Sequence, residues 1–99
     1  MAKQFDVFRT TSGALVVVLQ SDLIEATRTR VVAPLLPAGA VGSPMRGMNP
    51  TLGVGEEPVV LMPQLTATLT LAELGRRVGS VAHARDSIVR AVDMLLSGV

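Results

Sequence analysis

The stretch that decides the fold ends the chain: Ser80 to Val99 reads SVAHARDSIVRAVDMLLSGV. Apolar residues recur in it at three- and four-residue intervals, which is the spacing of the buried stripe of an amphipathic helix. Ser80 suits the N-cap, because its hydroxyl can accept a hydrogen bond from a first-turn N–H. We therefore predict a helix over residues 80–99, with Ile88 and Leu95 facing the core. The stripe consists of Val81, Ala84, Ile88, Ala91, Val92, Leu95 and Val99.

Short β-type segments separated by turn residues fill the rest of the chain. Residues 14–19, ALVVVL, form a continuous apolar run too short for a helix, which is typical of a strand buried on both faces. Residues 70–73, TLAE, match the S/T-x-x-E capping box and predict one helical turn. The Pro- and Gly-rich residues 37–50 predict an extended, mobile loop. Strands are predicted at Gln4–Phe8, Ala14–Leu19, Arg30–Leu35, Thr51–Val54, Val59–Met62 and Thr66–Leu69, with Arg76–Val78 extended.

This order predicts a mainly β fold with a C-terminal α-helix: a small, partly open antiparallel barrel with the helix packed on it. Pro34 lacks an N–H and is therefore expected at a sheet edge or at the end of its strand.

The composition excludes several classes of protein. The 99 residues suffice for one domain, residues 1–99, with a single core. The net charge of the whole chain is only +1, which does not indicate a nucleic-acid-binding protein. The absence of cysteine excludes thiolate catalysis and Cys-based zinc sites. The longest apolar run is far shorter than the roughly 20 residues of a membrane span, and the first residues lack the apolar core of a signal peptide. We therefore expect a cytoplasmic protein without a membrane anchor.

The sequence offers no convincing catalytic, metal or cofactor site. His83, the single histidine, has no metal-ligand partners at coordination spacing. The pair Glu56-Glu57 falls at a turn, where carboxylates usually only solvate the loop. Two basic clusters, Arg28-x-Arg30 and Arg76-Arg77, either solvate the surface or contact a phosphate or acidic partner. The protein is therefore expected to act by binding rather than by catalysis.

Several segments together resemble one protein family. They are Gln4-Phe5-x-Val7, residues 20–24 (QSDLI), Arg30-Val-Val-x-Pro34-Leu35, Leu61-Met62-x-Gln64, residues 73–80 and the terminal Gly98-Val99. In this order and spacing they resemble the CcdB-type toxins of toxin–antitoxin systems, in particular the chromosomally encoded branch. The resemblance implies an SH3-like barrel with a C-terminal helix, of the kind shared by CcdB and MazF, and a homodimer. It also implies a bacterial toxin that binds the GyrA subunit of DNA gyrase, traps cleaved DNA complexes and is neutralised by a CcdA-like antitoxin. The resemblance implies that the protein contacts DNA only indirectly, through the antitoxin or through gyrase.

The same resemblance implies which residues make the contacts. The gyrase-binding residues would be Leu23, Ile24, Leu96, Ser97, Gly98 and Val99, and the antitoxin-binding residues would be Leu23, Ile24 and Asp93. Ser97 departs from the family, because the best-known toxins carry Trp there, and an interface Trp commonly contributes several kcal/mol. Ser97 motivates one alternative, a degenerate member that binds antitoxin without poisoning gyrase. A second alternative, from another functional class, is an endoribonuclease of the structurally related MazF kind. The near-neutral charge and the lack of a placed base argue against the latter.

Overall fold

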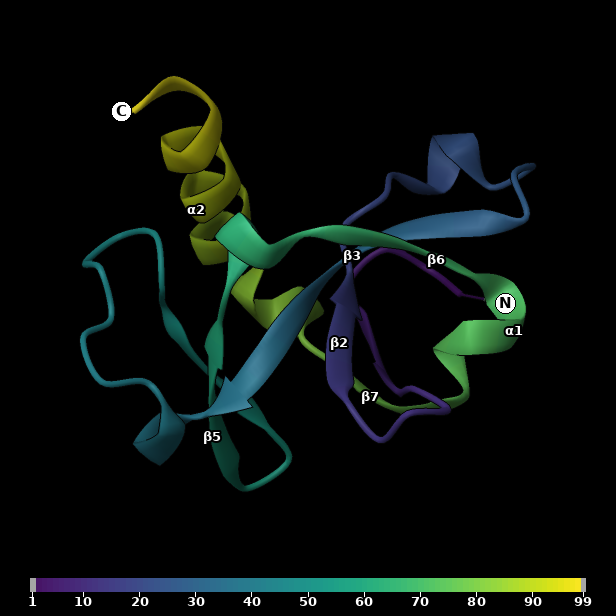
Figure 1. Cartoon of the computed structure of the whole chain (residues 1–99). Helices are drawn as coiled ribbons and strands as arrows, with labels where there is room; N and C mark the ends of the chain where they lie inside the picture. The colour runs from purple at the N-terminus through teal and green to yellow at the C-terminus, as the bar shows by residue number, and fades with distance from the viewer. Residues whose placement is uncertain (1, 99) are drawn as a thin grey trace.

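The computed structural model describes residues 2–98, in which seven short strands are followed by the long helix α2 (Figure 1). The predicted order of strands, loop, helical turn and terminal helix is confirmed, and the extended segment at residues 76–78 is part of a full strand. In chain order the elements are β1 (Asp6–Arg9), β2 (Leu15–Val18), the 3-10 helix η1 (Asp22–Ile24), β3 (Thr29–Pro37), η2 (Ala38–Ala40), β4 (Thr51–Val54), β5 (Glu57–Leu61), η3 (Pro63–Leu65), β6 (Ala67–Thr70), α1 (Leu71–Leu74), β7 (Arg76–Ser80), η4 (Ala82–Ala84) and α2 (Arg85–Ser97).

The longest strand, β3, belongs to both halves of the antiparallel sheet. Its first half pairs with β2 on one side and with β6 on the other, whereas Leu35–Pro37 pair with β5. Pro34 lies inside β3, so its predicted place at an edge or strand end is wrong. The Pro34 carbonyl accepts a hydrogen bond from Met62 N (3.0 Å), and the missing N–H faces the same side, between the start of β6 at Ala67 and the end of β5 at Leu61. The Met62 carbonyl opposite Pro34 accepts a hydrogen bond from Leu65 N (3.0 Å) instead, so the proline leaves no acceptor unpaired there.

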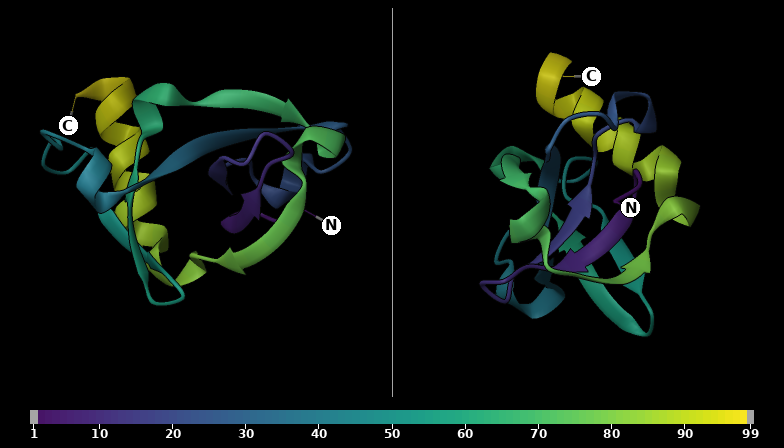
Figure 2. Two further views of the ribbon diagram at one scale, coloured as in Figure 1. Left: turned by 60° about the horizontal axis from the view of Figure 1, so that its bottom comes forward. Right: turned by 90° about the vertical axis from the view of Figure 1, so that its right-hand side faces the viewer.

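The strands β6, β3, β2, β1 and β7 form a curved sheet whose two outer strands are joined by α1 (Figure 2). The predicted helical turn is confirmed, with both halves of the capping box present. Thr70 N donates to Glu73 Oε1 (2.8 Å), and Glu73 N donates to Thr70 Oγ1 (3.1 Å). The hydrogen bonds from the Thr70 backbone and, second, from its hydroxyl hold the pKa of the Glu73 carboxyl below its usual value of 4.5. Gly75 ends the turn with φ 76°, in contact with the backbone of Arg9.

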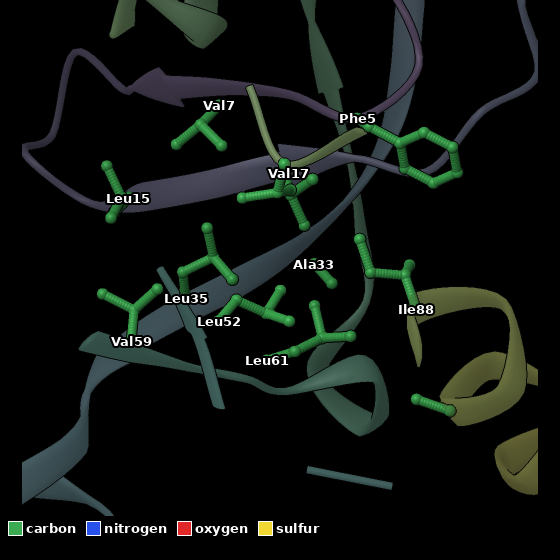
Figure 3. Packing of buried hydrophobic residues seen from close by; sticks show 12 residues of the cluster. Phe5, Val7, Leu15, Val17, Ala33, Leu35, Leu52, Val59, Leu61 and Ile88 are labelled. Atoms are coloured by element: carbon green, nitrogen blue, oxygen red, sulfur yellow. The ribbon is translucent and has the colours of Figure 1, made fainter. Parts of the chain in front are cut away.

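Two apolar clusters lie on opposite faces of β2, which confirms the prediction that this strand is buried on both sides. Leu15 and Val17 point into the main core, whereas Val16 and Val18 point into the second cluster, because successive side chains of a strand alternate. Figure 3 shows the main core between the sheet and Ile88 of α2. The main core consists of Phe5, Val7, Leu15, Val17, Ala33, Leu35, Leu52, Val59, Leu61, Val81, Ile88 and Ala91. The second consists of Ala2, Phe8, Val16, Val18, Val32 and Leu74.

The terminal helix begins at Arg85 and not at Ser80, so its predicted start is wrong. Ser80 is the last residue of β7, where it pairs with Asp6 of β1. Its hydroxyl accepts a hydrogen bond from Ala82 N (3.2 Å), the first residue of η4, and therefore does not cap α2. Pairing with the N-terminal segment holds residues 80–81 out of the helix despite their helical spacing, and residues 82–84 form the separate 3-10 helix η4.

The buried stripe of α2 ends one turn earlier than predicted. Ile88 and Ala91 are buried, whereas Leu95 is 39% exposed and does not face the core. Met94 is half-buried instead, with its thioether against Gly47 of the loop after β3. The last turn of α2 extends past the sheet in Figure 1, so it has no barrel surface to cover. None of the helices formed by residues 2–98 is long and apolar enough to cross a membrane.

The loop at residues 37–50 is tied down rather than freely extended. It contains the short helix η2, and its buried Asn49 accepts a hydrogen bond from Met45 N (2.8 Å) through Oδ1. The Asn49 amide donates to the Leu61 carbonyl (3.1 Å) and to Gln64 Oε1 (3.0 Å). One side chain therefore joins this loop to the end of β5 and to η3.

Candidate protein-binding surface

Two exposed apolar sites project from the same end of the molecule. Leu23 in η1 is 96% exposed, with Ile24 beside it, and Leu96 in the last turn of α2 is 78% exposed. Both lie at the top of Figure 1, η1 on the right and the end of α2 on the left, so they do not touch. At this exposure Leu23 and Leu96 contribute little to the core, and their aliphatic side chains are available to a partner.

The loop that carries Leu23 is closed by the side chain of Gln20. Its amide nitrogen donates to the carbonyl of Ile24 (2.6 Å) and to Thr27 Oγ1 (3.0 Å), and its Oε1 accepts from Val31 N (3.1 Å). Ser21 caps η1, because its hydroxyl accepts from Leu23 N (3.1 Å). The loop is therefore a closed, hydrogen-bonded unit although it lies on the surface.

Arg30 lies beneath this loop and is only 1% exposed. Its guanidinium donates to four backbone carbonyls: those of Thr27 (2.8 Å) and Thr29 (2.8 Å) through Nη1, that of Glu25 (3.2 Å) through Nη2, and that of Ala2 (3.2 Å) through Nε. Arg28, by contrast, is exposed. The two residues of the Arg28-x-Arg30 motif therefore do not form a basic surface cluster.

The N-terminal segment joins the η1 loop to the rest of the surface. Gln4 N donates to Asp22 Oδ1 (2.7 Å), and Lys3 forms an exposed ion pair with Glu25 (3.6 Å). The next residue, the buried Phe5, has φ 70°, which is rare for a bulky side chain. Hydrogen bonds hold this turn at both ends, from Phe5 N to Val18 O (2.7 Å) and from Val81 N to Phe5 O (2.9 Å).

A crevice of about 190 Å³ lies between this turn and α2. Gln4, which is bound to Asp22 of η1, lies on one side, and Val92 and Asp93 lie on the other. The crevice therefore lies between the neighbourhood of Leu23 and the helix that carries Leu96. Its lining consists of Gln4, Phe5, Leu19, Ile88, Val89, Val92 and Asp93.

The end of α2 is closed by its own hydrogen bonds. The Ser97 hydroxyl donates to the Asp93 carbonyl (2.8 Å), and Gly98, at φ 78°, donates its N–H to the Met94 carbonyl (2.8 Å). Ser97 and Gly98 are exposed, as is Asp93. Val99, named with them in the sequence analysis, lies outside the described residues.

The remaining polar candidates do not gather at this surface. His83 lies in η4, and Glu56-Glu57 lie at the tip of the β4–β5 hairpin. Arg77 forms an ion pair with the buried Asp6, with 3.2 Å between Nε and Oδ1, so it is partly engaged within the fold. Among residues 2–98 no group of His, Cys, Asp and Glu side chains could hold a metal ion. The arrangement is suited to binding another macromolecule through apolar contacts.

Sequence reasoning identified the exposed pair Leu23-Ile24 but missed the side chains that support it. Gln20 and Arg30 bond almost entirely to backbone carbonyls and amides, which leave no motif in the sequence. Only a weak signal for Arg30 was available in the sequence. Arg30 comes directly before the apolar, β-branched run that starts at Val31, so it is a charged residue at the beginning of a buried strand.

Comparison with known proteins gives one family match and several similar structures. The family model described as CcdB protein matches residues 4–98. A mycobacterial endoribonuclease in complex with its cognate antitoxin is similar with a TM-score of 0.81 and 17% identity, covering 97% of this chain and 95% of that one. A MazE–MazF structure from Deinococcus radiodurans has a TM-score of 0.75 and 17% identity, covering 98% and 97%. The predicted fold class, an SH3-like antiparallel half-barrel with a C-terminal helix, is therefore confirmed.

Proposed function

The chain belongs to the CcdB family, and on that premise we propose that it is the toxin of a CcdAB-like toxin–antitoxin system. It acts in the bacterial cytoplasm by binding the GyrA subunit of DNA gyrase and trapping cleaved DNA complexes, without catalysing a reaction of its own. One observation carries the proposal: Leu23 and Leu96, two of the residues predicted to contact gyrase, are the two most exposed large apolar side chains among the described residues. Burying such anchors supplies much of the energy of a typical protein interface.

The antitoxin uses part of the same surface. Of the proposed antitoxin contacts, Asp93 lines the crevice, whereas Leu23 and Ile24 lie in η1, which is bonded through Asp22 to Gln4 of the crevice. An antitoxin that covers these residues would block access to the gyrase contacts. The similar mycobacterial endoribonuclease and MazF proteins were solved with their antitoxins, which supports a partner of this kind. A disordered antitoxin segment that folds on binding can wrap a surface of this length.

A homodimer is part of the proposal. Met45, Leu65 and Leu95 are exposed apolar side chains on the loop after β3, on η3 and on α2. These segments lie together, because Met94 packs on Gly47 and Asn49 bonds to Gln64. A second copy would cover this apolar surface. We expect light scattering at micromolar concentration to give twice the chain mass, and a monomer mass throughout would contradict the dimer.

Binding to a GyrA fragment is the experiment that tests the function. Wild type should bind, and Leu23→Ala should weaken binding by about 30-fold, the effect of losing one interface anchor. Leu71→Ala is the matched control, because Leu71 is also an exposed leucine but lies on α1, away from the crevice. Induced expression should stop growth of a host with wild-type gyrase but not of one with toxin-resistant gyrase. Equal effects of the two leucine substitutions would place the interface elsewhere.

Ser97 separates a full toxin from the degenerate alternative. Its exposed hydroxyl bonds to the helix's own carbonyl and offers little contact area to a partner. We expect Ser97→Trp to tighten the gyrase complex by about 30- to 1,000-fold. Antitoxin binding without gyrase binding in wild type would favour the degenerate member.

The endoribonuclease alternative is motivated by the fold of the similar structures. It requires an acid–base pair beside a basic groove, and the candidate surface offers neither. We expect no cleavage when purified protein is incubated with bacterial RNA. Specific cleavage products would favour a MazF-like activity.

A further inference from the structure

We propose that Arg30 is a positioning residue that holds the Leu23-Ile24 loop in its partner-binding conformation before any partner arrives. The inference rests on the proposed function for the identity of the partner, but not for the behaviour of the loop. Three of the four carbonyls that Arg30 binds, those of Glu25, Thr27 and Thr29, lie in the loop and its junction with β3. The fourth, that of Ala2, ties the loop to the N-terminal segment.

The chemistry of this site requires arginine. A guanidinium at 1% exposure loses its hydration, and no carboxylate lies among its hydrogen-bond partners, so the four backbone carbonyls and the more distant Thr27 hydroxyl (3.5 Å) compensate the charge. The planar fork of arginine presents donors in several fixed directions at once, and here it reaches carbonyls in two segments of the chain. A lysine ammonium carries the same charge on a single nitrogen and does not reproduce this geometry.

The loop needs this support because its apolar side chains give it none. Leu23 is almost fully exposed and Ile24 is more than half exposed, so neither packs the loop against the core. The conformation of η1 therefore depends on hydrogen bonds. Those of Arg30 hold the buried side of the loop, and those of Gln20 join its two ends. Holding a loop in its bound conformation reduces the entropy lost on binding.

The experiment compares Arg30→Lys with Arg28→Lys. The two variants carry the same change two residues apart, but Arg28 is exposed. The first readout is backbone amide relaxation by NMR in the absence of a partner. Residues 22–28 should be rigid in wild type and in Arg28→Lys, with backbone order parameters of about 0.85. In Arg30→Lys the order parameters of these residues should fall below about 0.6. Strands β2 and β5 should keep their wild-type values.

The second readout is a double-mutant cycle with Leu23→Ala, measured as affinity for a GyrA fragment. If Arg30 acts through the loop, Leu23→Ala costs about 30-fold in wild type and less than about 3-fold in the Arg30→Lys background. If Leu23→Ala costs as much in the Arg30→Lys background as in wild type, or if the loop stays rigid in Arg30→Lys, Arg30 supports the fold only and the proposal is overturned. If Arg30→Lys does not fold, the wild-type relaxation decides, since order parameters below about 0.6 at residues 22–28 would also overturn it. A wild type that binds no gyrase but has a rigid, Arg30-dependent loop would refute the proposed partner and leave the positioning role intact.

Discussion

Replacing Ile88 by alanine tests how α2 is attached to the barrel. Ile88 is 1% exposed and lies in the main core opposite Phe5 and Leu61 (Figure 3). At about 0.8 kcal/mol per methylene-sized group, the shortened side chain forfeits about 2.4 kcal/mol of burial. A remaining cavity of about 60 Å³ adds about 1.4 kcal/mol at about 24 cal/mol per Å³. The free energy of unfolding should therefore fall by about 2.5–4 kcal/mol, with the upper value applying if nothing relaxes.

Arg90→Ala is the control on the same helix. Arg90 is exposed, so its truncation should change the free energy of unfolding by no more than about 0.5 kcal/mol. Urea unfolding followed by far-UV circular dichroism suits a chain without Trp or Tyr. All variants should be compared at one protein concentration, because a dimer makes stability concentration-dependent. Equal midpoint shifts for the two variants would refute the observed rotation of α2 about its axis.

Three further predictions concern the scaffold. Gly75→Ala should lower the free energy of unfolding by more than about 2 kcal/mol, because a Cβ at this positive φ would collide with the Arg9 backbone; Gly13→Ala, also at positive φ but with open space around it, should cost less in the same urea titration. Asn49→Ala should cost about 2–3 kcal/mol by leaving buried backbone groups unpaired and should speed proteolysis of residues 42–48, and an unchanged cleavage rate there would contradict its role. Folding lowers the pKa of the Glu73 carboxyl, so the stability that this group contributes is present above pH 4.5 and is lost as the pH falls through the folded-state pKa. Glu73→Gln should therefore flatten the loss of stability between about pH 6 and about pH 3. Parallel curves of unfolding free energy against pH for wild type and Glu73→Gln would argue against the capping box.

The arrangement of the strands could be predicted because local signals and the fold agree. The run at residues 14–19 has the β-branched composition of a buried strand, and the capping box before Gly75 marks α1. The start of α2 could not be predicted, because Ser80 fits the helical spacing of the sequence but pairs with Asp6 as the last residue of strand β7. Here the tertiary contact prevails over the local pattern. The same holds for Leu95, whose spacing is correct but which lies beyond the end of the barrel.

The candidate surface was predictable only in its exposed parts. The Leu23-Ile24 pair stands out as an apolar dipeptide between polar residues, and the resemblance named it directly. The crevice was not predictable, because Gln4, Leu19 and Val92 come together only in the folded chain. The role of Arg30 was also hidden, since an arginine in a sequence usually indicates a surface position and backbone acceptors carry no residue signature.

The double pairing of β3 has a consequence for how the protein loses its structure. Because one strand is hydrogen-bonded to β2 and β6 in its first half and to β5 in its second, neither half of the sheet can separate without disturbing the strand that holds the other. We therefore expect partial opening to be confined to the margins of the domain, and the β3 amides to exchange with solvent through global unfolding. A protease that must reach this strand would then have to wait for global unfolding, and the unfolding barrier would set the lifetime of the protein.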